Sequence, residues 1–159
     1  GINTEISFIP SEKMYFKGGF TVQNSQYEEA QDFDEKAFLR TPNSYGYLNF
    51  SVAPNKDFEA TLSGIYTGSM LIPYFGMQIS DPDAGELRTS DSFFDLGLKL
   101  QYQFKINGAK MQIYTGIKNI LNSYQNDFDR GIDRDPGYIY GPTMPRTIYV
   151  GIKIGNNIQ

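Results

Sequence analysis

The chain has 159 residues, enough for one domain with a sizeable core, and its formal net charge is −4. The composition of 12 Tyr, 12 Phe and 16 Gly, with no Trp, Cys or His, favours strands over helices. The acidic balance argues against nucleic acid as a partner, and the lack of Cys and His excludes Ser-His-Asp and Cys-His catalysis and His metal sites.

Seven segments alternate apolar and polar residues with a period of two, which is typical of strands with two different faces. In chain order they cover 2–8, 14–23, 47–52, 58–67, 94–106, 111–118 and 147–154. The fifth is the clearest, because every second residue from Phe94 to Ile106 is apolar. A helix would scatter these residues around its circumference. The pattern therefore predicts an all-β fold, an antiparallel meander of about seven strands.

The connections between these segments alternate in length. Tight turns are expected at 10–13, 54–56 and 107–109, each containing Pro, Gly or Asn. Long polar links are expected at about 24–44, 71–91 and 121–144. Compact soluble domains rarely contain three such links, whereas transmembrane barrels combine short periplasmic turns with long outer loops.

Alternation reports two faces but does not show which face meets lipid, so a soluble antiparallel barrel or sandwich stays open. Small polar residues on the polar faces suit a lumen, and the segments are long enough to span a bilayer when tilted. Aromatic residues near strand ends suggest an interfacial girdle: Tyr45, Tyr47, Tyr66, Tyr74, Phe75, Phe93 and Phe94. These points favour a transmembrane β-barrel.

The last third of the chain carries a family resemblance. Gly116-Ile117-Lys118-Asn119-Ile120-Leu121-Asn122, followed by Tyr124, resembles the penultimate strand of TonB-dependent outer-membrane receptors. The Gly-Pro-x-x-Pro-Arg stretch from Gly141 to Arg146 precedes a final strand, as in the C-terminus of such receptors, especially Bacteroidetes-type sequences. The resemblance rests on specific residues in 116–155. In the residues before 116, only the arrangement of strands and loops is similar. The ending Asn157-Ile158-Gln159 departs from the aromatic terminus common in these barrels.

The resemblance implies that residues 1–159 form the C-terminal portion of the barrel domain in the outer membrane. The plug domain and TonB box of the family are not found in this chain, which shows no signal peptide and is expected to be a piece or a processed form. The implied partners are outer-membrane lipid, the rest of the barrel and plug, the TonB complex, and a scarce ligand such as a ferric siderophore, haem or cobalamin. About seven strands leave two unpaired edges, which invite pairing.

The long links hold the candidate ligand-binding residues, because aromatic rings can stack on a planar ligand and such loops face outward. They are Tyr27, Tyr74, Phe75, Tyr124, Arg130, Arg134 and Tyr138. An acidic stretch at 27–36 suits a cationic or metal-chelate ligand. Asp127, Asp129 and Asp133 form a weak calcium candidate that lacks the closing Glu of a full loop. A solvated loop with self-compensating charge is the simpler interpretation of this stretch.

Three functions therefore stay open at the level of sequence. The first is TonB-driven import, with the chain as part of the barrel wall. The second is a stand-alone porin or adhesin barrel, and the third is a soluble lipocalin-like barrel that binds an apolar ligand. No enzyme activity and no cofactor are expected.

Overall fold

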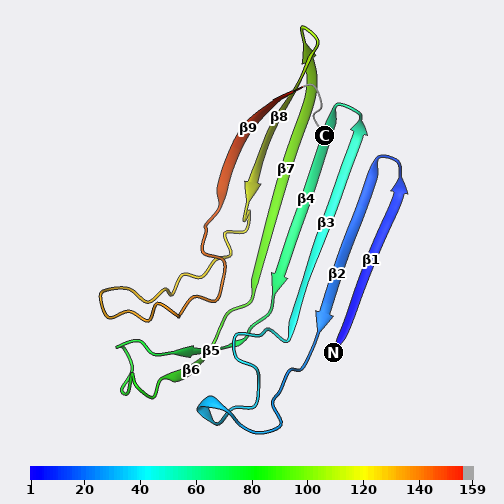
Figure 1. Ribbon diagram of the computed structural model, residues 1–159. Helices are drawn as coiled ribbons and strands as arrows, with labels where there is room; N and C mark the ends of the chain where they lie inside the picture. Colours follow the sequence, from blue (N-terminus) through cyan, green and yellow to red (C-terminus); the bar gives the residue numbers. More distant parts are fainter. Residues whose placement is uncertain (156–159) are drawn as a thin grey trace.

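The computed structural model describes residues 1–155, which form one large antiparallel sheet and one small hairpin (Figure 1). The large sheet contains β1 (Ile2–Ser11), β2 (Met14–Val22), β3 (Ser44–Asn55), β4 (Phe58–Thr67), β7 (Phe93–Ile106), β8 (Ala109–Lys118) and β9 (Thr147–Gly155). Their spatial order is β1-β2-β3-β4-β7-β8-β9, which confirms the predicted all-β antiparallel meander of seven strands. Within the described residues no helix is long and apolar enough to cross a membrane.

The three hairpin turns at one end of the sheet are only two residues long. In the last of them, Asn107 and Gly108 both have positive φ, 50° and 83°, as a turn that follows the right-handed twist of its strands requires. In the middle turn, the side chain of Asn55 accepts hydrogen bonds from the backbone N–H groups of Asp57 and Phe58, both at 2.9 Å. These local contacts set the register of each hairpin.

The register places most apolar residues of the seven strands on one face, with Ile65, which pairs with Tyr47 and Asp95, as an exception on the other. One row shows this directly, because every member is apolar and each pairs with the next across the sheet: Phe8, Phe16, Phe50, Leu62, Leu98, Ile117 and Ile148. No charged residue lies on this face between Ile2 and Ile154 at the paired positions of the seven strands. We call it the apolar face.

No layer of the described chain covers the apolar face. Ile148 and Val150 on β9 are 74% and 75% exposed, and Ile2 and Ile6 on β1 are also largely exposed. The five buried hydrophobic residues of the described chain lie in the links or at the start of β7: Met70, Ile72, Tyr74, Phe93 and Tyr138. A large uncovered apolar surface of this kind marks a surface that meets lipid or a partner.

The opposite face of the sheet is polar and cross-linked by side chains. Glu5 accepts hydrogen bonds from the hydroxyl of Tyr47 and forms an ion pair with Lys17 at 3.1 Å. Gln101 donates to Glu59 at 2.7 Å, so this carboxylate also has a partner on the neighbouring strand. These contacts join β1, β2 and β3, and then β4 and β7. We call this surface the polar face.

Two glycines on the polar face lie beneath tyrosine rings of neighbouring strands. A Cβ atom on Gly116 would lie 2.5 Å from the backbone oxygen of Leu98 and 2.5 Å from the hydroxyl of Tyr149. A Cβ on Gly151 would collide with the ring of Tyr114. The absence of a side chain at each glycine therefore lets a ring cover the adjacent strand, a recognised way to stabilise sheets that contain glycine.

Substitution of Gly116 by alanine is therefore expected to lower the free energy of unfolding by about 1–3 kcal/mol, because the backbone oxygen of Leu98 has little freedom to move. Gly97 on β7 is the matched control, since the nearest atom to its Cβ would be the Ser63 hydroxyl at 3.0 Å and the nearest backbone atom, the Ile117 oxygen, would be at an ordinary 3.6 Å. Denaturant unfolding in detergent would measure both changes. Equal stability of the two variants would contradict this account of the ring packing.

The second link contains structure that the alternation pattern did not predict. β5 (Leu71–Tyr74) and β6 (Glu86–Thr89) pair as an antiparallel hairpin within the stretch expected to be a plain polar connection. Each strand has only four residues, and Pro73 interrupts β5. A pattern this short, with a proline inside it, does not register as alternation.

The expected aromatic girdle is mostly wrong in its membership. Of its seven residues only Tyr66 and Phe94, which pair with each other, lie on the apolar face of the large sheet. Tyr45 and Tyr47 lie on the polar face, and Tyr74 and Phe93 are buried among the links. Proximity to a strand end is not sufficient, because the parity of the position decides which face the ring occupies.

Candidate functional site

The three long links leave the same end of the large sheet, opposite the short turns (Figure 1). The first link covers 23–43, the second 68–92 and the third 119–146. The first contains a short 3-10 helix, η1 (Asp32–Asp34), and an isolated bridge between Gln26 and Ala37. The links therefore have internal structure, and together they form the candidate site.

Asn119 fixes the point where the chain leaves β8. Its side-chain amide donates to the backbone oxygens of Ser123 and Met144 at 3.1 and 3.0 Å, and its oxygen accepts from the Ser123 N–H at 2.8 Å. It is only 3% exposed and has a φ of 49°, a conformation that asparagine tolerates better than most residues. One side chain thus closes the exit turn and holds the returning strand.

Asn122 and Arg146 complete this junction. The side-chain oxygen of Asn122 accepts from the Arg146 N–H at 3.0 Å, and the guanidinium of Arg146 donates to the backbone oxygen of Ile120 at 2.8 Å. Asn119, Asn122 and Arg146 belong to the stretches that carry the sequence resemblance, and each has a defined hydrogen-bonding role here. The motif residues thus act first as a clamp between β8 and β9.

The second and third links share a small core. Met70, Ile72 and Tyr74 of the second link cluster with Tyr138 of the third. The guanidinium carbon of Arg88 lies 3.5 Å from the ring centroid of Tyr74 and 5.4 Å from that of Tyr138, so the cation lies against two aromatic rings. Arg88 also forms an ion pair with Glu86 at 2.7 Å. This packing joins β5 and β6 to the third link.

Gln125 organises the third link from within. It is 1% exposed, its amide donates to the backbone oxygen of Tyr138 at 3.0 Å, and its oxygen accepts from the Tyr140 N–H at 2.9 Å. The carboxylate of Asp127 accepts from the hydroxyls of both tyrosines, at 3.0 and 2.7 Å. Asp127 therefore fixes the hydroxyl groups of Tyr138 and Tyr140 in place.

Two of the three calcium candidates, Asp127 and Asp129, serve other contacts, and Asp133 is exposed. Asp127 binds the two tyrosine hydroxyls, and Asp129 accepts from the Asp135 N–H at 2.8 Å and the Arg130 N–H at 2.9 Å. Across residues 1–155 no group of three or more acidic, His or Cys side chains is arranged to hold a metal ion. The oxygen atoms of this stretch stabilise the fold of the third link.

These contacts shift the pKa values of the groups involved. The Asp135 N–H, together with the Arg130 N–H and the Tyr74 hydroxyl, holds the pKa of Asp129 below its ordinary 3.8. Burial raises the pKa of Tyr140 well above its ordinary 10.0, and the hydrogen bond to Asp127 raises it further. Burial likewise raises the pKa values of Tyr74 and Tyr138. The buried rings therefore favour their neutral form.

An alkaline titration is expected to show these three tyrosines ionising late. Because their native pKa values are raised, their contribution to stability is fully present below pH 10 and is lost as the pH rises through the native values. Phenolate absorbance of the folded protein would measure this, with Tyr140→Phe removing one late-ionising group. Ionisation of every tyrosine together near pH 10 would contradict the burial argument.

The first link forms a separate hollow of about 400 Å³. The rings of Tyr27 and Phe38 lie 4.4 Å apart at its wall, and Asp32 and Glu35 also line it. Glu35 accepts from the backbone N–H groups of Lys36 and Ala37, at 2.8 and 2.9 Å, so its carboxylate is fixed in place. An aromatic pair beside carboxylates is suited to a cationic ligand group.

The predicted site residues fall into two groups. Tyr74 and Tyr138 are buried and support the links, whereas Tyr27, Phe75, Arg130 and Arg134 are exposed and Tyr124 is partly exposed. Phe75 packs against Phe33 with ring centroids 5.8 Å apart. Sequence reasoning missed Arg88 and Gln125, because their partners lie far away in the chain or are backbone atoms, and it found Asn119 only as part of the resemblance, without its hydrogen-bonding role.

Comparison with known proteins adds no relative: no protein-family model, curated protein or solved structure matches the chain.

Proposed function

We propose that the chain is part of the wall of an outer-membrane β-barrel of the TonB-dependent receptor type, which imports a scarce ligand. The observation that supports this most strongly is the apolar face, which is continuous across seven strands, free of charged residues and uncovered. A sheet in contact with lipid needs such a face, because a charge there costs about 2–4 kcal/mol at the bilayer centre.

Aromatic residues at both ends of the apolar face support the same proposal. Phe20, Tyr66 and Phe94 gather at the end near the links, where the rings of Phe20 and Tyr66 lie 5.9 Å apart. Tyr102 and Phe104 lie near the short turns, with ring centroids 6.2 Å apart. On β4 and β7 these two aromatic bands are separated by Leu62, Leu96, Leu98 and Leu100, as in the girdles of transmembrane barrels, while β1, β2 and β3 also carry a phenylalanine at mid-height.

The arrangement of links and edges fits a receptor wall. The structured links would form part of the outer binding surface, with the hollow at Tyr27 and Phe38 as a ligand contact. β1 pairs only with β2 and β9 only with β8 in the described chain, so both outer edges would pair with the rest of the barrel. The polar face would line the lumen that holds the plug, and the TonB complex would engage the receptor outside this part of the wall.

Uptake by a strain deleted for the parent gene tests this proposal. Loss of growth on one ligand from a panel of ferric siderophores, haem and cobalamin, restored by the gene, is the expected result. Uptake that persists without the TonB complex would favour a porin-like barrel. A parent protein that stays soluble without detergent would contradict every membrane function and favour a lipocalin-like barrel.

A further inference from the structure

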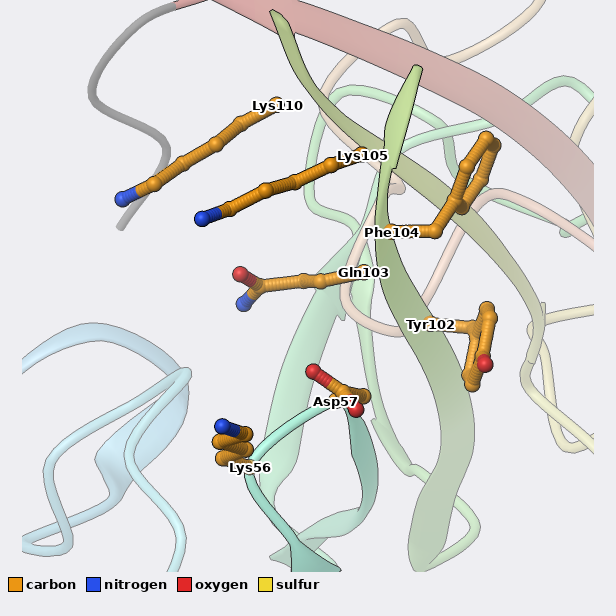
Figure 2. Close-up of a pocket in the computed structure, with 7 residues that line it drawn as sticks. All are labelled: Lys56, Asp57, Tyr102, Gln103, Phe104, Lys105 and Lys110. Atoms are coloured by element: carbon orange, nitrogen blue, oxygen red, sulfur yellow. The ribbon is translucent and has the colours of Figure 1, made fainter. Parts of the chain in front are cut away.

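The polar face carries a cluster of lysines at its short-turn end. Lys105 on β7 and Lys110 on β8 are directly opposite each other across the strands. In Figure 2 both extend to the same side as Gln103, whereas Tyr102 and Phe104 extend to the other side. Lys56 and Asp57, in the neighbouring turn, complete a hollow of about 500 Å³. We call this group, with Lys153 described below, the lysine cluster.

The lysine cluster has an excess of positive charge. Lys56, Lys105, Lys110 and Lys153 contribute four positive charges against the single carboxylate of Asp57, a difference of +3 (4 − 1) in a chain whose net charge is −4. Among residues 1–155 the ion pairs are Lys17–Glu5 and Arg88–Glu86, neither of which lies here. Like charges directly opposite each other in a sheet are destabilising.

Among residues 1–155, Glu59 on β4 forms no ion pair with these lysines. Glu59 accepts from the amide of Gln101 at 2.7 Å and from the hydroxyl of Thr61 at 3.1 Å. Three lysines of this face lie against aromatic rings, since Lys99 and Lys153 are each 5.9 Å from the Tyr114 centroid and Lys118 is 5.7 Å from that of Tyr149. Among residues 1–155, Lys105 and Lys110 form no ion pair and lie over no aromatic ring.

A buried amide lies within the same cluster. Gln112 pairs with Gln103 on one side and with Lys153 on the other, two residues along β8 from Lys110 and therefore on the same face. It is 1% exposed, and its side-chain oxygen has no hydrogen-bond partner in the described chain. An acceptor left in this state costs about 1–3 kcal/mol. It requires an N–H or O–H donor.

We propose that the lysine cluster binds an acidic, extended segment of polypeptide. Its carboxylates would pair with Lys105, Lys110 and Lys153, and a backbone N–H would donate to the free oxygen of Gln112. Inorganic phosphate could also neutralise the lysines, but its hydrogenphosphate form has a single O–H, whereas a peptide offers a backbone N–H at each residue beside its carboxylates. The charge and the unpaired amide together therefore favour a peptide. This inference does not depend on whether the apolar face meets lipid.

Fluorescence anisotropy with the purified chain in zwitterionic detergent tests the proposal. The probe is a labelled peptide of alternating Glu and Ala, and a peptide of alternating Gln and Ala is its neutral control. The acidic peptide is expected to bind and to weaken as the ionic strength rises. Equal binding of the Gln peptide would overturn the proposal.

Matched variants separate this cluster from general charge attraction. Lys105→Gln/Lys110→Gln is expected to weaken the acidic peptide about tenfold, whereas Lys13→Gln/Lys36→Gln, which removes the same charge elsewhere, is expected to leave binding within about twofold. Equal losses in both pairs would overturn the proposal. The Lys105/Lys110 variant is also expected to keep its melting temperature, because it removes a repulsive pair.

Gln112→Met tests the amide separately. Methionine fills similar space without a polar oxygen, so peptide binding is expected to weaken by about threefold to tenfold while stability is retained or improved. Competition with pyrophosphate identifies the ligand class. If pyrophosphate displaces the peptide completely and Gln112→Met binds the peptide as the parent chain does, the site recognises small anions and the proposal for a peptide is wrong.

Discussion

Lysine in place of Leu98 is expected to prevent stable insertion of the sheet into a bilayer. Leu98 lies at the middle of β7 on the apolar face and pairs with Leu62 and Ile117. A lysine at the bilayer midplane costs about 2–4 kcal/mol, a large share of the stability of a typical domain. Denaturant unfolding of the parent protein in lipid vesicles would measure this loss.

Two controls make the Leu98→Lys experiment specific. Ser63→Lys places the same charge near the same level of the sheet but on the polar face, where little loss is expected, because Ser63 lies opposite Gly97 and Asn49. Ile106→Lys keeps the apolar face but lies at the end of β7, where the cost should fall to about 0–1 kcal/mol. Equal losses of unfolding free energy at Leu98 and Ile106 would mean that the cost of the charge does not depend on depth in a bilayer. That result would contradict the membrane proposal.

Removal of the Asn119 side chain is expected to open the third link. Asn119→Ala leaves the Ser123 N–H and two backbone oxygens without their partner and forces alanine into a φ near 49°. The lost hydrogen bonds should lower the local free energy of opening by about 2–4 kcal/mol. Amide hydrogen exchange at Ile120, Asn122 and Arg146 would report the change, because it measures local as well as global opening.

Asn119→Gly separates the two parts of this effect. Glycine adopts a positive φ without strain, so this variant should recover about 1 kcal/mol relative to alanine and no more. Full recovery of protection in Asn119→Gly would mean that the backbone conformation alone matters. That result would contradict the role of the Asn119 side chain as a clamp between β8 and β9.

The seven main strands could be predicted from the sequence because each has at least six residues of alternating polarity, and in β7 the alternation runs from Phe94 to Ile106. Asn107-Gly108 also identifies its turn locally, since both residues tolerate positive φ. The register across the sheet follows from the same alternation, because a slip by one residue would expose every apolar side chain on the polar face.

The link core could not be predicted in the same way. Arg88 contacts Tyr74 in its own link and Tyr138 in the third link. The spacing of residues along the sequence does not predict either contact. Gln125 forms hydrogen bonds with backbone atoms of Tyr138 and Tyr140. Because every residue type has these atoms, the sequence does not identify the partners. Tyr47 does not belong in the girdle, because its alternation with Leu48 in the sequence already places it on the polar face.

The orientation of β7 in the native membrane tests the central claim most directly. The chain has no Cys, so a single cysteine introduced at each successive position from Leu96 to Gln101 is the only thiol of this chain available for labelling. We predict that spin labels at Leu96, Leu98 and Leu100 contact lipid-soluble quencher, whereas those at Gly97, Lys99 and Gln101 contact water-soluble quencher. Lipid contact at neither set of positions would contradict the account.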